Sequence, residues 1–192
     1  PYDCLGRALE ALAEAYPNTR VQLMETVLSG GPEKLLGGEA DLLIAGSVPP
    51  GFLGDHLLQL EFIAVAHPGH ALHHLDRPLT LQDLSGQRQI VVRDSALGPG
   101  QDSGWLGAEQ RWTVSHLATS VDMVTRGMGF AWLPYSRVAP LLRRGELVEL
   151  PLAQGARRNS SLYLTHADRD RSGPATCHLA DLIKIETASY RA

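Results

Sequence analysis

The chain has 192 residues, with 17 Lys or Arg against 21 Asp or Glu, and a formal net charge of −4 at pH 7. Hydrophobic residues make up 44% and charged residues 20%, which excludes a disordered chain and a coiled coil. No apolar run reaches the roughly 18 residues of a membrane span, and the opening residues predict no export signal. The slightly acidic balance excludes a surface that holds a phosphate backbone, so we expect any contact with DNA to be made outside this segment.

The two cysteines, Cys4 and Cys177, lie near opposite ends of the sequence. No Cys-x-x-Cys pair occurs, which argues against thiol redox chemistry and a cysteine zinc site. We expect plain buried thiols, although the sequence leaves a disulfide between them open.

Helix and strand patterns alternate along the whole chain. Helices are predicted from Leu5 to Tyr16, around Leu35 and Leu36, from Thr80, from Leu117 to Gly127, from Ser136 as N-cap to Arg144, and after Pro174. Strands are predicted around Arg20–Glu25, at Asp41–Ala45 as a buried parallel strand, and at Phe62–Ala66, Ile90–Val92, Trp112–Val114, Phe130–Leu133, Leu147–Leu150 and Ser161–Thr165. The alternation predicts an α/β fold, and two similar blocks without a flexible joint predict two lobes joined by short extended crossovers.

The order and spacing of several short motifs carry a family resemblance. These motifs are Ala15-Tyr16-Pro17-Asn18, Leu35–Gly38 with Ala40–Ile44, Val65–Leu72, Leu81–Leu84, Val124–Pro134 and Gly145–Val148. Together they resemble the effector-binding (substrate-binding) domain of LysR-type transcriptional regulators over nearly the whole chain. The resemblance implies two Rossmann-like lobes joined by two crossover strands, in the manner of type II periplasmic binding proteins. It places lobe I at residues 1–66 and 135–192, and lobe II at residues 67–134.

The sequence departs from the family at several positions. The family's N-terminal winged helix-turn-helix DNA-binding domain is absent from this chain, and so is the strand that usually precedes the first helix. We expect that strand to belong to residues before Pro1. Gly6 and Ala71 stand where the family commonly has prolines, and Gly6 loosens the first turn of a helix that borders the expected pocket.

Ligand positions follow from the fold class. In open α/β sheets a ligand lies beyond the carboxyl ends of strands and near helix N-termini, where unpaired N–H groups favour anions. In the family the corresponding positions border an interlobe cleft. The predicted ligand-binding residues are Asp3, Thr26, Gly46, Ser47, His67, Asp94, Ser95, Ser115 and His116.

Each of these positions also has a purely structural interpretation. Ser115 and Asp3 are plausible helix N-caps, Thr26 a strand-to-turn junction, Gly46 a turn residue and His116 a solvated first-turn residue that can donate to a carboxylate. Asp3 would repel an anion unless it points away, or it would pair with the amine of an amino acid. The sequence therefore leaves carboxylate and amino-acid-like ligands both open.

Catalytic and metal signatures are missing from the sequence. His67, His70, His73 and His74 crowd one segment, but Pro68 and Gly69 break any helix there, so we interpret a solvated loop rather than a metal site. No nucleophile elbow, phosphate loop or distinctive Ser-His-Asp spacing occurs. Arg143-Arg144 and Arg157-Arg158 are interpreted as solvated faces or helix-end charges. We expect no enzyme activity, no metal and no cofactor.

The resemblance predicts a cytoplasmic ligand-sensing domain of a transcription factor. A small-molecule effector would bind between the lobes, the domain would form a homodimer and the full-length protein a tetramer, and DNA would be bound only through the missing N-terminal domain, with no membrane contact. The alternative is a solute-binding protein of a transport system with the same fold. A small lyase or transferase on this scaffold is a third class, but it needs a nucleophile or an acid–base pair that the sequence does not show.

Overall fold

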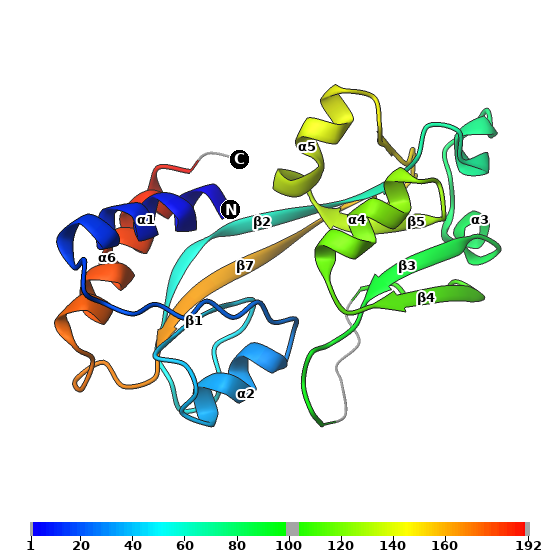
Figure 1. Ribbon diagram of the computed structural model, residues 1–192. Coiled ribbons are helices and arrows are strands. Elements are labelled where there is room, and N and C mark those ends of the chain that lie inside the picture. Colours follow the sequence, from blue (N-terminus) through cyan, green and yellow to red (C-terminus); the bar gives the residue numbers. More distant parts are fainter. Residues whose placement is uncertain (1, 99–103, 191–192) are drawn as a thin grey trace. The chain divides into compact units, whose positions relative to one another are not determined.

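The computed structural model describes residues 2–98 and 104–190 (Figure 1). The chain divides into two compact units. Unit 1 comprises Pro1–Leu60, Ser95–Pro99 and Ser161–Ala192, and unit 2 comprises Glu61–Asp94 and Gly100–Ser160. Two long strands, β2 (Gly54–Ala66) and β7 (Arg157–His166), begin in one unit and end in the other. Within the described residues, no helix combines the length and apolar character needed to cross a membrane.

Unit 1 is built on two long helices and the end of a sheet. The helices α1 (Tyr2–Ala15) and α6 (Pro174–Ala188) lie side by side (Figure 1). The strand β1 (Leu42–Ala45) pairs antiparallel with β7, which neighbours β2. Ala8, Ala180, Ile183 and Leu164 form the buried core between helices and sheet. The helical spacing of the apolar residues in α1 and α6 thus produces one shared buried face.

Unit 2 has strands β2, β5 (Phe130–Pro134), β3 (Arg88–Val92) and β4 (Gln110–Val114) in that order, and β6 (Val148–Glu149) pairs with β2. β5 is antiparallel to β2, whereas β3 is parallel to both β4 and β5. Because strand side chains alternate between faces, β5 contributes Ala131 and Leu133 to one core and Phe130 to another.

Helices cover both faces of this sheet. The first core includes Val124 of α4 (Leu117–Thr125) and Val138 of α5 (Tyr135–Arg143). The second includes Leu84 of α3 (Leu81–Ser85) and Leu72 of a 3-10 helix, Ala71–His74. A helix-covered sheet is the layered architecture that the alternating pattern predicts, and the α/β fold class is confirmed.

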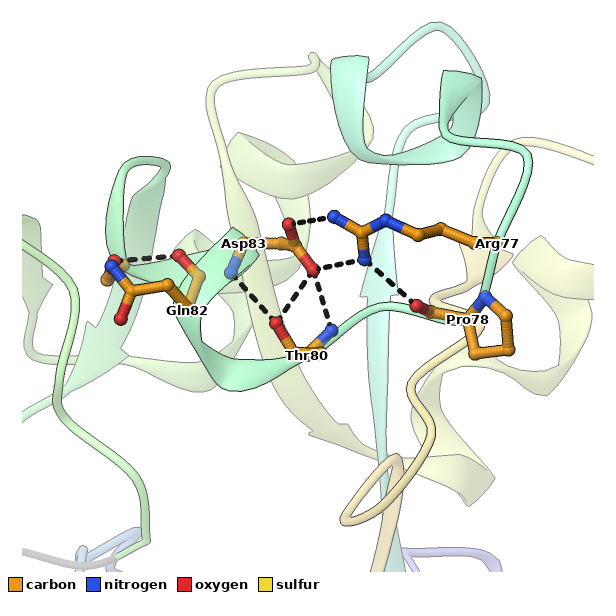
Figure 2. Close-up of polar contacts among 6 residues, drawn as sticks. Arg77, Pro78, Thr80, Gln82 and Asp83 are labelled. Carbon is orange, nitrogen blue, oxygen red and sulfur yellow. Dashed lines mark hydrogen bonds and ion pairs between the residues drawn. The ribbon is translucent and has the colours of Figure 1, made fainter.

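The start of α3 is fixed by reciprocal hydrogen bonds. The Asp83 backbone N–H donates to the Thr80 hydroxyl, and the Thr80 backbone N–H donates to the Asp83 carboxylate at 2.8 Å (Figure 2). Arg77 adds a two-point ion pair, with Nη1 at 2.8 Å and Nη2 at 2.6 Å from the two Asp83 oxygens. The near capping box expected from Thr80 to Asp83 is therefore a complete one.

Three local predictions are wrong. Residues 20–25 form no strand, because no described segment pairs with them, and Val21 and Leu23 remain 51% and 59% exposed. β1 is antiparallel rather than parallel and lies at the end of the strand order, so only Leu43 is buried. Ser136 is not the cap of α5, since the helix already begins at Tyr135 with Pro134 as its N-cap.

The unit boundaries differ from the predicted lobe boundaries. Residues 135–160 were expected in lobe I, but α5, Leu147 and Leu150 pack into the cores of unit 2. Residues 95–98 were expected in lobe II, but the Ser95 and Leu97 backbones bond to Val27 and Glu33 of unit 1. Cys4 and Cys177 are both free thiols.

Candidate functional site

The first turn of α1 carries Asp3, with its side chain exposed. The helix already includes Tyr2, so the prediction of Asp3 as an N-cap is wrong. A carboxylate inside the first turn lies at the positive end of the helix dipole, which stabilises its negative charge.

The start of α2 (Gly30–Leu36) brings Thr26 and Ser95 close to one short stretch of backbone. The Ser95 hydroxyl accepts a hydrogen bond from the Val27 N–H at 2.8 Å and lies within reach of the Val27 carbonyl at 3.2 Å. A Cβ on Gly30 would fall 2.1 Å from the Ser95 oxygen, and one on Gly31 would fall 2.9 Å from the Thr26 hydroxyl. The two glycines therefore make room for two hydroxyl groups, which sequence reasoning did not anticipate.

Gly46 and Ser47 form an exposed bend directly after β1. They belong to unit 1, as do Asp3, Thr26 and Ser95. Five of the nine predicted residues therefore lie in unit 1, each at a strand end or at a helix start.

The carboxyl ends of β3 and β4 hold three of the four predicted residues of unit 2, namely Asp94, Ser115 and His116. The two strands are parallel and in register from Arg88–Gln110 to Val92–Val114, so Asp94 and Ser115 follow neighbouring strand ends. The prediction of Ser115 as N-cap is wrong, because the N-cap of α4 is His116, whose side chain makes no capping hydrogen bond. Ser115 and His116 are both exposed and Asp94 is half-buried. The first turn of α4 thus offers backbone N–H groups that the N-cap side chain does not satisfy.

His67 lies after β2 and belongs to a turn stabilised by imidazoles. Its Nδ1 accepts from the Gly69 N–H at 3.0 Å, and His70 Nδ1 accepts from the Leu72 N–H at 3.2 Å. Burial, followed by the charges of neighbouring histidines, lowers the pKa of His70, and burial also lowers the pKa of His73. In the described part of the chain, no group of three His, Cys, Asp or Glu side chains is placed to hold a metal ion.

Two adjacent arginines have different surroundings, which the sequence reasoning missed. Arg157 pairs with Glu149 at 2.6 Å and with Glu61 at 3.2 Å. Arg158 instead stacks its guanidinium 4.2 Å from the centre of a Trp132 ring. Side chains alternate between the two faces of the sheet along a strand such as β7, so adjacent residues are expected on opposite faces.

A family model described as LysR substrate binding domain matches residues 2–188. The HTH-type transcriptional regulator YeeY of Escherichia coli is 29% identical over 158 residues, which is 78% of this chain and 50% of the relative. This chain therefore spans about half the length of that relative.

Solved structures show the same fold. The regulatory domain of CcmR from Synechocystis, in complex with 2-PG, has a TM-score of 0.73 at 15% identity and covers 98% of this chain and 93% of its own. Full-length LysG from Corynebacterium glutamicum with bound effector Arg has a TM-score of 0.70 at 17% identity, covering 96% and 63%. These likenesses confirm the type II periplasmic-binding-protein-like fold. The chain, matched from its first helix to its last, belongs to the LysR family of transcriptional regulators through their substrate-binding domain.

Proposed function

We propose that this chain is the ligand-sensing domain of a transcription factor and binds a small metabolite of carboxylate or amino-acid-like chemistry. The observation that carries the proposal is the family match over residues 2–188. Because the chain spans about half the length of the relative YeeY, we assign DNA binding to a part of the protein outside this segment. We also infer a cytoplasmic location. No observation favours the alternative of a transport protein.

The ligand chemistry is supported by the predicted residues and by two relatives. LysG is described with bound effector Arg and CcmR with 2-PG. The exposed start of α4, with Ser115 and His116, presents N–H groups and hydrogen-bond donors that suit an anionic group. In unit 1, Thr26 and Ser95 add hydroxyl groups beside α2. That these positions contact one ligand stays a prediction.

Signalling requires that the ligand bind two arrangements of the protein with different affinities, since a ligand with equal affinities shifts no equilibrium. We propose that the domain works as a homodimer and the full-length protein as a tetramer. Sedimentation of the purified chain should give the dimer mass, and a monomer persisting at high protein concentration would contradict it.

Thermal unfolding of the purified chain against a library of carboxylates, amino acids and aromatic acids tests the ligand proposal. A ligand at a hundredfold excess over its Kd stabilises the folded state by about 2.7 kcal/mol. We expect the shift to be lost in Thr26→Val and His116→Ala. His74→Ala, which changes an exposed histidine outside the predicted set, should retain the shift. A stabilising ligand that both site variants bind unchanged, or no stabilising ligand at all, would contradict the proposal.

A further inference from the structure

The guanidinium of Arg158 is held between two surfaces of unit 2. One surface is the Trp132 ring, 4.2 Å away at its centre. The other is Gly104, where a Cβ would fall 2.2 Å from Arg158 Nη1. Gly104 also has a φ of +79°, a conformation that L side chains rarely adopt. Glycine therefore meets both requirements at this position, and the guanidinium is confined.

Both neighbours of Arg158 are themselves fixed. The Trp132 indole N–H donates to the Gly155 carbonyl at 2.9 Å. The buried Gln89 amide donates to the Trp105 carbonyl at 2.8 Å, which anchors the chain next to Gly104. Trp105 also lies 5.9 Å from Trp132 between ring centres. The surroundings of Arg158 are thus preorganised rather than a loose surface arrangement.

Arg158 differs from Arg88 and Arg157, two other arginines that lie over aromatic rings. Arg88 stacks on Trp112 but donates to the Met128 carbonyl and the Gln110 side chain. Arg157 lies over Tyr135 but pairs with two glutamates. For Arg158, residues 2–98 and 104–190 supply no carboxylate or hydrogen-bond acceptor, and burial lowers the pKa of its half-buried guanidinium. A partly desolvated cation that no described residue neutralises attracts an anion.

We propose that Arg158 and Trp132 form a binding site in unit 2 for a small carboxylate with a planar apolar body. Trp132 covers a face of the guanidinium and Gly104 lies against Nη1, which leaves the edge formed by the Nε–H and Nη2–H groups to donate to both oxygens of a carboxylate. The half-buried rings of Trp105 and Trp132 provide the apolar surface beside that edge. This site adds a ligand class and a binding position to the proposed function. It rests on that function in one respect, which is that the bound carboxylate is the effector.

The probes are benzoate and its neutral analogue benzamide. Their binding is measured from the shifts of the indole N–H resonances of the three tryptophans in ¹⁵N NMR spectra. We expect benzoate to shift the Trp132 resonance saturably and to leave Trp112 unchanged, although Trp112 also carries a stacked arginine. Benzamide should bind about tenfold more weakly or worse, since a charge-assisted hydrogen bond contributes about 1.5–3 kcal/mol.

Two adjacent substitutions separate the site from general charge effects. Arg158→Gln should weaken benzoate binding about tenfold or more, whereas Arg157→Gln, whose guanidinium is already paired, should change it less than about twofold. Unchanged ¹⁵N spectra outside the substituted strand show that each variant is folded. Absence of a saturable Trp132 shift, or equal binding by Arg158→Gln, would overturn the site.

Failure of the site and failure of the sensor function give different results. If the thermal library yields a ligand that Arg158→Gln binds normally, and benzoate gives no saturable Trp132 shift, the site is wrong and the sensor function stands. If benzoate binds through Arg158 but no library compound changes DNA binding by the full-length regulator, the site stands and the sensor function is wrong.

Discussion

The carboxylate of Asp83 collects more polar contacts than a surface ion pair usually has. It accepts from Arg77 at both oxygens and from the backbone N–H and the hydroxyl of Thr80 (Figure 2). Arg77 first, and then the two Thr80 donors, lower the pKa of Asp83 well below its usual range. The folded state therefore favours the charged carboxylate, and the start of α3 depends on that charge.

Asp83→Asn should destabilise unit 2 in a pH-dependent way. Because the folded pKa is depressed, the stabilisation is complete above the unfolded pKa of about 3.9 and is lost as pH falls through the lower folded pKa. Urea unfolding should show the largest difference between wild type and variant near neutral pH and a shrinking one below about pH 4. Asp122→Asn, which breaks an exposed i,i+4 pair with Arg126, is the control and should have little effect at either pH. A pH-independent Asp83→Asn effect would contradict this account.

Core position determines the cost of losing a leucine side chain. Leu164 on β7 is 1% exposed and belongs to the core of unit 1, whereas Leu53 in the same unit is 88% exposed. Leu164→Ala should lower the free energy of unfolding by about 2–5 kcal/mol, and Leu53→Ala should change it by less than about 0.5 kcal/mol. Urea denaturation measures both, and similar costs for the two variants would contradict the assigned burial.

Among the elements, the turn from His67 to the 3-10 helix depends on neutral imidazoles. His67 and His70 each use Nδ1 as a hydrogen-bond acceptor, a role that a doubly protonated ring cannot fill. The nearby His73 also has a pKa lowered by burial, and the mutual effect of the histidines opposes a second charge. Protonation therefore removes the bond that caps the 3-10 helix.

His70→Asn separates the hydrogen bond from the titration. The Asn side-chain oxygen can accept from the Leu72 N–H in the same local geometry but does not titrate. Since the folded pKa of His70 is depressed, its contribution to stability is complete above the unfolded pKa of about 6.5 and is lost as pH falls through the folded pKa. The variant should lose less stability than wild type between about pH 7 and pH 5, as followed by urea unfolding. A pH dependence as steep as in wild type would show that His70 does not contribute.

Elements that are determined by residues close together in the sequence could be predicted from the sequence. The apolar spacing of α1 and α6, the glycines that end α2 and the capping box of α3 all act within a few residues. The strand expected at 20–25 failed because alternation indicates a strand only where a partner exists. β1 was misjudged because its direction is set by β7, more than a hundred residues later.

The candidate site shows the same limit. The sequence indicated strand ends and helix starts, and Asp94, Ser115 and His116 do follow the parallel strands β3 and β4. It could not reveal that Ser95 lies against Gly30 and Val27, because those contacts join segments about 65 residues apart. The different surroundings of Arg157 and Arg158 likewise result from strand alternation combined with partners that are distant in the sequence.

On the scale of the whole molecule, the two units share backbone rather than a linker. β2 and β7 each contribute residues to both units. The backbone hydrogen bonds of each strand therefore stabilise both units. If either strand detaches from the sheet in one unit, the part of the same strand that lies in the other unit is destabilised. We therefore expect the units to unfold as one cooperative system, as small domains usually do.

The three tryptophans make this cooperativity measurable, because Trp105, Trp112 and Trp132 all lie in unit 2, whereas far-UV circular dichroism reports the helices of both units. In urea, tryptophan fluorescence and circular dichroism should follow one transition. Leu164→Ala, a change in the core of unit 1, should move the tryptophan midpoint as far as the circular dichroism midpoint. Leu53→Ala should move neither.

If Leu164→Ala instead produces an early circular dichroism transition with an unchanged tryptophan midpoint, the units unfold independently and the shared strands do not couple them. Coincident shifts would mean that a ligand stabilising one unit also stabilises the other, because binding to the folded state draws on the same cooperative transition.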